Sequence, residues 1–150
     1  MKKQTVFAGA IAIALGFGGS AFAGEQVAYT IVEDGIPTAL SVEAGNVERG
    51  RDAMINRKQG NCLACHAISV LSDQPFHGEV GPTLDGVAGR WDEPQLRLIL
   101  VNSKEVFEDT IMPAFYKAEG YNRVAKKFDG KSILSAQQVE DVIAFLQTLK

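Results

Sequence analysis

Residues 62–66 read Cys62-Leu63-Ala64-Cys65-His66, and this stretch decides what the rest of the chain must fold around. The spacing is C-x-x-C-H, the attachment sequence of c-type haem. Two thiols one helical turn apart can each add to a vinyl group on the same porphyrin edge, and the imidazole that follows can reach the iron as its proximal ligand. The pattern therefore predicts one covalently bound haem c, tethered by Cys62 and Cys65 and ligated by His66.

Three other interpretations of the cysteine pair stay open at this point. A thioredoxin-like redox pair is expected in a βαβ setting, and no such pattern surrounds these residues. A zinc site could combine Cys62, Cys65, His66 and His77, although two adjacent ligands suit tetrahedral coordination poorly. A short disulfide between the two cysteines is the third alternative.

The iron needs a second protein ligand or keeps an open position. Met112 lies in the segment Ile111-Met112-Pro113, in a loop that can cross the far face of the ring. Met54 falls on the apolar face of an expected helix, and His77 lies among loop residues. We therefore expect Met112 as the second ligand, with His77 or an open site as the alternatives. Thioether ligation raises the reduction potential, and an iron without a vacancy favours electron transfer over oxygen chemistry.

The N-terminus has the pattern of a secretory signal peptide. Lysines at positions 2 and 3 precede a charge-free apolar run over residues 6–17, and Ala21-Phe22-Ala23 offers a cleavage site. The run is shorter than the roughly 20 residues that span a bilayer, which argues against a membrane anchor. We expect residues 1–23 to be removed and the mature protein to act in the periplasm.

Composition fits one compact domain and excludes several classes of protein. The chain has 150 residues, of which 46% are hydrophobic and 22% charged, and its formal net charge is −3. These values are ordinary for a globular domain and lack the basic surplus of a nucleic-acid binder. With only two cysteines, a disulfide-framework scaffold is excluded.

Three helices are expected after an extended N-terminal arm over residues 24–45. The first begins after Asn46, presents Val47, Gly50 and Met54 on one face, and ends near Gly60. The others begin at Pro94 and after Ser135. Between the first two, residues 67–90 form a long glycine-rich loop, which suggests that a cofactor fills part of the core.

From Asn46 to Lys150 the sequence resembles the class I cytochromes c. The likeness rests on the haem motif, on Gly81-Pro82-Thr83-Leu84 and the glycines that follow, on the Met112-Pro113 loop and on the closing helix. It implies an all-α class I cytochrome c fold around one covalent haem. It also implies that the Pro82 carbonyl orients His66, that Arg90 and Trp91 contact haem propionates, and that Gly50 packs on Phe145.

Longer strings resemble the SoxX family of small monohaem cytochromes. They are Gly89-Arg90-Trp91, residues 96–102, residues 111–116, residues 122–125 and residues 128–131. The resemblance implies a heterodimer with a SoxA-type haem subunit, held partly by the arm, in the SoxAX complex. That complex joins thiosulfate oxidatively to a cysteine of the SoxYZ carrier (L-cysteine S-thiosulfotransferase activity) and passes electrons to a mobile acceptor.

The cysteine count defines the part that this chain can take in such a complex. If both thiols form thioether bonds, no free cysteine remains to carry sulfur, so the chain would not be catalytic alone. The apolar side chains of the arm, Val27, Tyr29, Ile31 and Ile36, are expected to face the partner. The alternative is a free soluble electron carrier with no enzyme role, which would need no such arm.

Overall fold

The computed structural model describes residues 26–150, so the predicted signal peptide lies outside the described residues. Three α-helices form the body: α1 (Val47–Ile55), α2 (Glu93–Asn102) and α3 (Ala136–Leu146). Between them lie short 3₁₀ turns, of which η1 (Cys62–Ala64) and η4 (Ser103–Glu105) bear on the site. Among the described residues there is no sheet, and the only bridge joins Val32 to Gly35. The expected all-α fold is confirmed.

The first and third helices begin where the sequence predicts, and α2 begins at Glu93, one residue before the predicted Pro94. Each helix has a side-chain cap. Asn46 accepts a hydrogen bond from the backbone N–H of Arg49 at 2.9 Å. Asp92 and Ser135 form capping boxes, which satisfy two otherwise unpaired donors at the start of α2 and α3. The first helix ends at Ile55 and does not reach Gly60, because the chain turns back over residues 56–61 to present the first cysteine.

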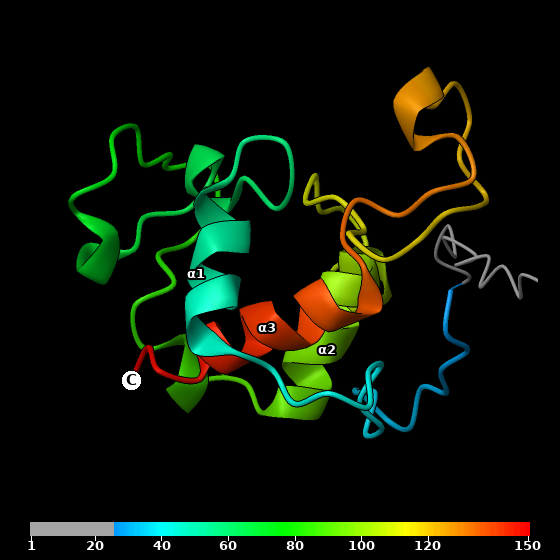
Figure 1. The fold of residues 1–150 in the computed structure, drawn as a ribbon, viewed down its shortest axis with the longest axis horizontal. Helices are drawn as coiled ribbons and strands as arrows, with labels where there is room; N and C mark the ends of the chain where they lie inside the picture. The colour runs from blue at the N-terminus through cyan, green and yellow to red at the C-terminus, as the bar shows by residue number, and fades with distance from the viewer. Residues whose placement is uncertain (1–25) are drawn as a thin grey trace, which may run out of the picture.

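The helices pack closely where α1 crosses α3, and α3 lies between α1 and α2 (Figure 1). A Cβ at Gly50 would lie 2.6 Å from the carbonyl carbon of Asp141 and 3.0 Å from Cβ of Phe145, so no larger residue fits there. Met54 is buried in the core, as expected. The prediction that Val47 belongs to the same face is wrong, since Val47 is 39% exposed and Ala53 takes the buried position instead.

Part of the arm belongs to the core of this chain. Ile36 and Leu40 are fully buried, and the Ile36 N–H donates to the Pro94 carbonyl at 2.9 Å. The prediction that Ile36 faces a partner is therefore wrong, because its side chain packs into the body formed by α2 and α3. Residues Val27, Tyr29, Ile31 and Val32 are different, since they are between 39% and 53% exposed.

A buried ion pair connects the arm to two helices. Arg97 on α2 donates to both carboxylate oxygens of Glu140 on α3, at 2.8 Å each. The Arg97 guanidinium also donates to the Ile36 carbonyl at 2.7 Å, and Glu140 accepts the Leu40 N–H at 2.9 Å. Both side chains are more than nine-tenths buried, so this pair joins α2, α3 and the arm inside the protein.

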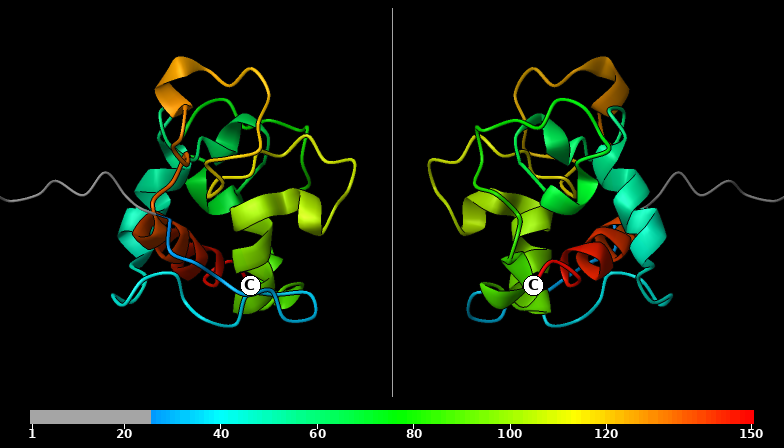
Figure 2. Two further views of the ribbon diagram at one scale, coloured as in Figure 1. Left: turned by 90° about the vertical axis from the view of Figure 1, so that its right-hand side faces the viewer. Right: turned by 90° about the vertical axis from the view of Figure 1, so that its left-hand side faces the viewer.

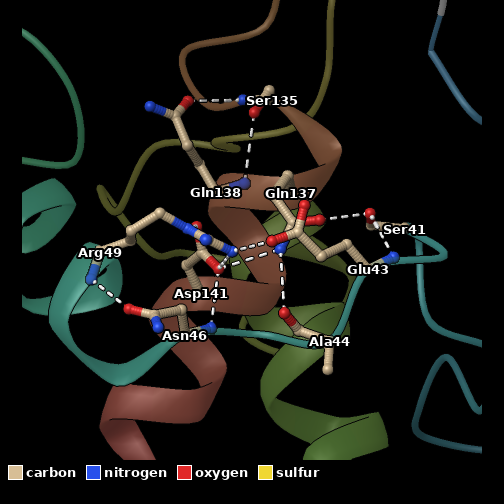
Figure 3. A network of polar contacts seen from close by, with 9 residues as sticks. All are labelled: Ser41, Glu43, Ala44, Asn46, Arg49, Ser135, Gln137, Gln138 and Asp141. Atoms are coloured by element: carbon tan, nitrogen blue, oxygen red, sulfur yellow. Dashed lines mark hydrogen bonds and ion pairs between the residues drawn. The ribbon is translucent and has the colours of Figure 1, made fainter.

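A second polar network holds the end of the arm and the start of α1 against α3 (Figure 3). Arg49 donates from two nitrogens to the Asp141 carboxylate, at 2.8 and 2.9 Å, and the Asn46 N–H donates to the same group at 2.8 Å. Burial alone would raise the pKa of Asp141. The hydrogen bonds from Arg49, Gln137 and Asn46 outweigh this effect and hold its pKa below the ordinary value.

The middle of the segment between Met112 and α3, residues 117–132, leaves the helical body. It carries the 3₁₀ turn η5 (Lys126–Phe128), which projects away from the three helices in both views (Figure 2).

No helix in residues 26–150 has the length and apolar character needed to cross a membrane.

Candidate haem site

The two cysteines lie on a tight turn that starts where α1 has ended. Asn61 adopts a left-handed conformation (φ 49°), and η1 then places Cys62 and Cys65 at its two ends. The N–H groups of Cys65 and His66 both donate to the Cys62 carbonyl, at 3.1 and 3.0 Å. The turn therefore holds the two thiols and the imidazole in one compact unit.

The arrangement of the side chains does not favour two of the alternative interpretations, the disulfide and the zinc site. Both thiols are free, so the structure forms no disulfide between them. Burial, helped by the neighbouring Cys65, raises the pKa of Cys62 to about 12, so this thiol is protonated at neutral pH. In the described part of the chain, no three His, Cys, Asp or Glu side chains are grouped to bind a metal ion.

The imidazole of His66 is held in one orientation. Its Nδ1 lies 2.7 Å from the Pro82 carbonyl oxygen, which can only accept, so Nδ1 carries the proton. The other ring nitrogen, Nε2, then has its lone pair free, which is the state that a metal ligand needs. The contact with Pro82 is the one that the cytochrome c resemblance implies.

A glycine-rich loop lies directly on the cysteine turn. The Gly78 N–H donates to the Leu63 carbonyl at 2.7 Å, and the Gly81 N–H donates to the Cys65 carbonyl at 2.8 Å. A Cβ at Gly81 would lie 2.6 Å from Nδ1 of His66, so the ring rests on bare backbone. These residues fit a haem attached through Cys62 and Cys65, because the thiols are unpaired and the imidazole is pre-oriented.

His77 is a structural residue. Its Nδ1 accepts the Ile68 N–H at 3.2 Å, and its Nε2 donates to the Leu71 carbonyl at 3.0 Å. Both ring nitrogens are thus occupied by backbone groups of the loop that follows the cysteine turn. This arrangement leaves His77 without a nitrogen to offer to iron or zinc.

Met112 is half-buried and packs against the core, on a loop fixed to the end of α2. Its carbonyl accepts a hydrogen bond from the Ser103 hydroxyl at 2.8 Å, and its N–H donates to the Thr110 hydroxyl at 3.1 Å. Neither contact can be predicted from the sequence, because serine and threonine at these positions are typical of any helix end or turn.

Arg90 and Trp91 contact segments that follow the cysteine turn in the sequence. The Arg90 guanidinium donates to the carbonyl oxygens of Thr83 and Asp85, at 2.9 and 2.8 Å, which fixes the loop that follows Pro82. Trp91 is half-buried and meets Phe107 edge to face, with ring centroids 5.9 Å apart. Contact of these two residues with haem propionates stays a prediction.

The fold and this arrangement define a haem-binding electron-transfer domain. The family model described as Cytochrome c matches residues 47–150, and the chain belongs to the cytochrome c family. Together with the spacing of Cys62 and Cys65, this membership supports one covalent haem c.

Among solved structures, the chain is similar to one in the crystal structure of SoxXA from P. pantotrophus. The two are 46% identical, the match covers 81% of this chain and 94% of that chain, and the TM-score is 0.76. The predicted resemblance to the SoxX family is thereby confirmed. A comparison with curated protein sequences found no significant match.

Proposed function

We propose that this chain is the electron-transfer subunit of a periplasmic SoxAX complex, paired with a SoxA-type haem subunit. The observation that carries the proposal is the 46% identity with a chain of SoxXA over 94% of that chain's length. Export through the signal peptide predicted at residues 1–23 agrees with haem attachment outside the cytoplasm.

The residues of the site would each hold the haem in a different way. Cys62 and Cys65 would form the two thioether bonds, His66 would ligate the iron from one side, and Met112 would ligate it from the other. The Pro82 carbonyl keeps His66 in the tautomer that this requires. When bound, the haem supplies a centre that carries one electron at a time.

The overall reaction explains why such a subunit is needed. Joining thiosulfate to a cysteine thiol of the SoxYZ carrier forms one S–S bond and releases one proton and two electrons. Both cysteines of this chain would be bound to haem, so the bond-forming thiol belongs to another subunit. This chain would accept the electrons singly and pass them to a mobile acceptor, and it has no thiosulfotransferase activity by itself.

The N-terminal segment supports a lasting partnership. Val27, Tyr29, Ile31 and Val32 expose apolar side chains next to one another in sequence, and all four are at least 39% exposed. Burial of each such side chain in an interface contributes about 1.5–3 kcal/mol before ordering costs are subtracted. A free carrier would gain nothing from exposing this segment.

Co-expression with the partner subunit tests the proposal. The SoxA-type chain, carrying an affinity tag, should retain the haem-bearing protein as a one-to-one complex. Ile31→Asp should release it at least tenfold more readily while leaving the haem spectrum unchanged. Val42→Asp is the matched control, because Val42 is fully exposed but lies outside this segment. A chain that stays monomeric beside its partner, yet exchanges electrons rapidly with a soluble cytochrome, would establish the free-carrier alternative.

A further inference from the structure

Both backbone polar groups of Met112 are bound by side chains that come from the segment between α2 and the Met112 loop. The Met112 carbonyl accepts from Ser103 Oγ at 2.8 Å and, more distantly, from Lys104 Nζ at 3.4 Å. The Met112 N–H donates to Thr110 Oγ1 at 3.1 Å. Neither backbone group of Met112 is therefore left to bind water, although the residue lies in a loop.

Of the two side chains that donate to the Met112 carbonyl, Ser103 is held more firmly than Lys104. It directly follows α2 and is fully buried, so its hydroxyl has no water to exchange with. Its own carbonyl is also fixed, since it accepts the N–H groups of Val106 and Phe107 at 3.2 and 2.9 Å. Loss of the hydroxyl would leave the Met112 carbonyl with only the exposed, longer contact from Lys104.

The chain beyond Met112 is anchored to the same helix end. The Phe115 N–H donates to the Leu100 carbonyl at 3.0 Å, and the Tyr116 N–H donates to the Val101 carbonyl at 3.3 Å. These bonds use carbonyls at the end of α2 that have no partner inside the helix. Met112 therefore lies between two fixed points, with only Pro113 and Ala114 separating it from the second.

We propose that Ser103 and Thr110 are positioning residues that latch Met112 in place as the axial ligand of the iron. The inference rests on the proposed site, in which Met112 supplies the thioether. A thioether is a weak ligand that external ligands displace readily, so its hold on the iron depends on how firmly the backbone behind it is held. Groups that orient a metal ligand contribute about 10–100-fold to metal affinity or activity. The hydrogen bonds from Ser103 and Thr110, which we call the latch, should have an effect of this size on the hold of Met112.

The test compares variants of the full haem-loaded protein by two spectroscopic readouts. Ser103→Ala and Thr110→Val each remove one hydroxyl, and the second is close to isosteric. Both should weaken the near-infrared absorption of thioether-ligated ferric haem, and both should bind cyanide in the ferric state about tenfold more tightly than the parent protein. Met112→Ala should abolish the absorption altogether.

Ser132→Ala is the matched control. The Ser132 hydroxyl donates to the Leu134 carbonyl at 2.6 Å, a bond of the same kind from a side chain that makes no hydrogen bond to Met112. It should leave both readouts unchanged. If Ser132→Ala shifts cyanide affinity as much as Ser103→Ala does, or if neither latch variant shifts it, the latch is refuted. A parent protein without the near-infrared absorption would instead refute Met112 as the ligand, which is a separate failure.

Discussion

Glu140→Gln should be among the most damaging single changes to this protein, because it breaks the ion pair that joins α2, α3 and the arm. The side chains of Arg97 and Glu140 are only 4% and 7% exposed. Without the Glu140 carboxylate, the buried guanidinium of Arg97 keeps two neutral acceptors, the Ile36 carbonyl and the glutamine amide oxygen. Its one remaining anionic neighbour is the exposed Glu93 carboxylate, at 3.9 Å. Breaking one half of a buried pair costs about 3–5 kcal/mol.

Urea unfolding of the haem-loaded protein measures this loss. We expect about 3 kcal/mol, the lower end of the range, because glutamine still accepts the Leu40 N–H and one bond from Arg97. With an unfolding slope of about 2 kcal/mol/M, the midpoint should fall by roughly 1.5 M. The exposed pair between Arg49 and Glu43 gives the control, since Glu43→Gln should change stability by less than about 0.5 kcal/mol.

A double substitution distinguishes the stability lost through an unpaired buried charge from the stability lost through altered packing. If the damage comes from an unpaired buried charge, Arg97→Met with Glu140→Met should lose much less than the two single changes together, because both charges are then gone. Additive losses would show that the two residues act independently. If Glu140→Gln lowered the free energy of unfolding by less than about 1 kcal/mol, the reasoning would also be refuted, since the Arg97 guanidinium would then be solvated by water.

Three further predictions follow from the site and from α3. The protein should hold one equivalent of haem that survives acid extraction, and Cys62→Ser should lower the folded yield and make haem partly extractable; an unchanged haem content would contradict thioether attachment there. Gly81→Ala should displace the His66 ring, alter the ferric spectrum and lower stability, whereas Gly89→Ala should not, because a Cβ at Gly89 meets nothing within 4 Å. The folded pKa of Asp141 is depressed, so its stabilisation is complete above the ordinary carboxylate range and is lost as pH falls through the folded value. Asp141→Asn should therefore lower the Tm near neutral pH but reduce its further fall in acid, and an equal fall for both proteins would contradict this.

Local signals in the sequence were enough for the helix starts and for the cysteine turn. Asn46 and Ser135 act as the predicted caps through bonds to residues three positions away, whereas the cap Asp92 was not predicted and starts α2 one residue early. The predicted end of the first helix near Gly60 is wrong, because the chain turns back over residues 56–61 toward Cys62 and the helix stops at Ile55. Features that depend on residues a few positions apart, such as the helix starts, are thus predictable. Features that depend on the path of the rest of the chain, such as the end of the first helix, are not.

The burial of the arm could not be predicted for a related reason. Arg97 interrupts an apolar string and Glu140 lies on an amphipathic helix, so each has the pattern of a solvated side chain. Their pairing joins positions 43 residues apart, and it supplies the charges that bind the Ile36 carbonyl and the Leu40 N–H. Ile36 looked like one more exposed apolar residue of the arm because its partners lie so far away in sequence.

The structure therefore divides the arm into two parts with different roles under the proposed function. Around Ile36 and Leu40 it completes the core and cannot be offered to a partner without unfolding the chain. Before them, residues 27–32 stay exposed but are tethered, since the Val27 N–H donates to the Tyr116 hydroxyl at 2.7 Å and Gln26 donates to the Tyr116 carbonyl. Tyr116 in turn is bound to the end of α2, which also carries the Ser103 contact to Met112. Under the proposed function, a partner that covers residues 27–32 would thus bind the same structural unit that holds the backbone of Met112.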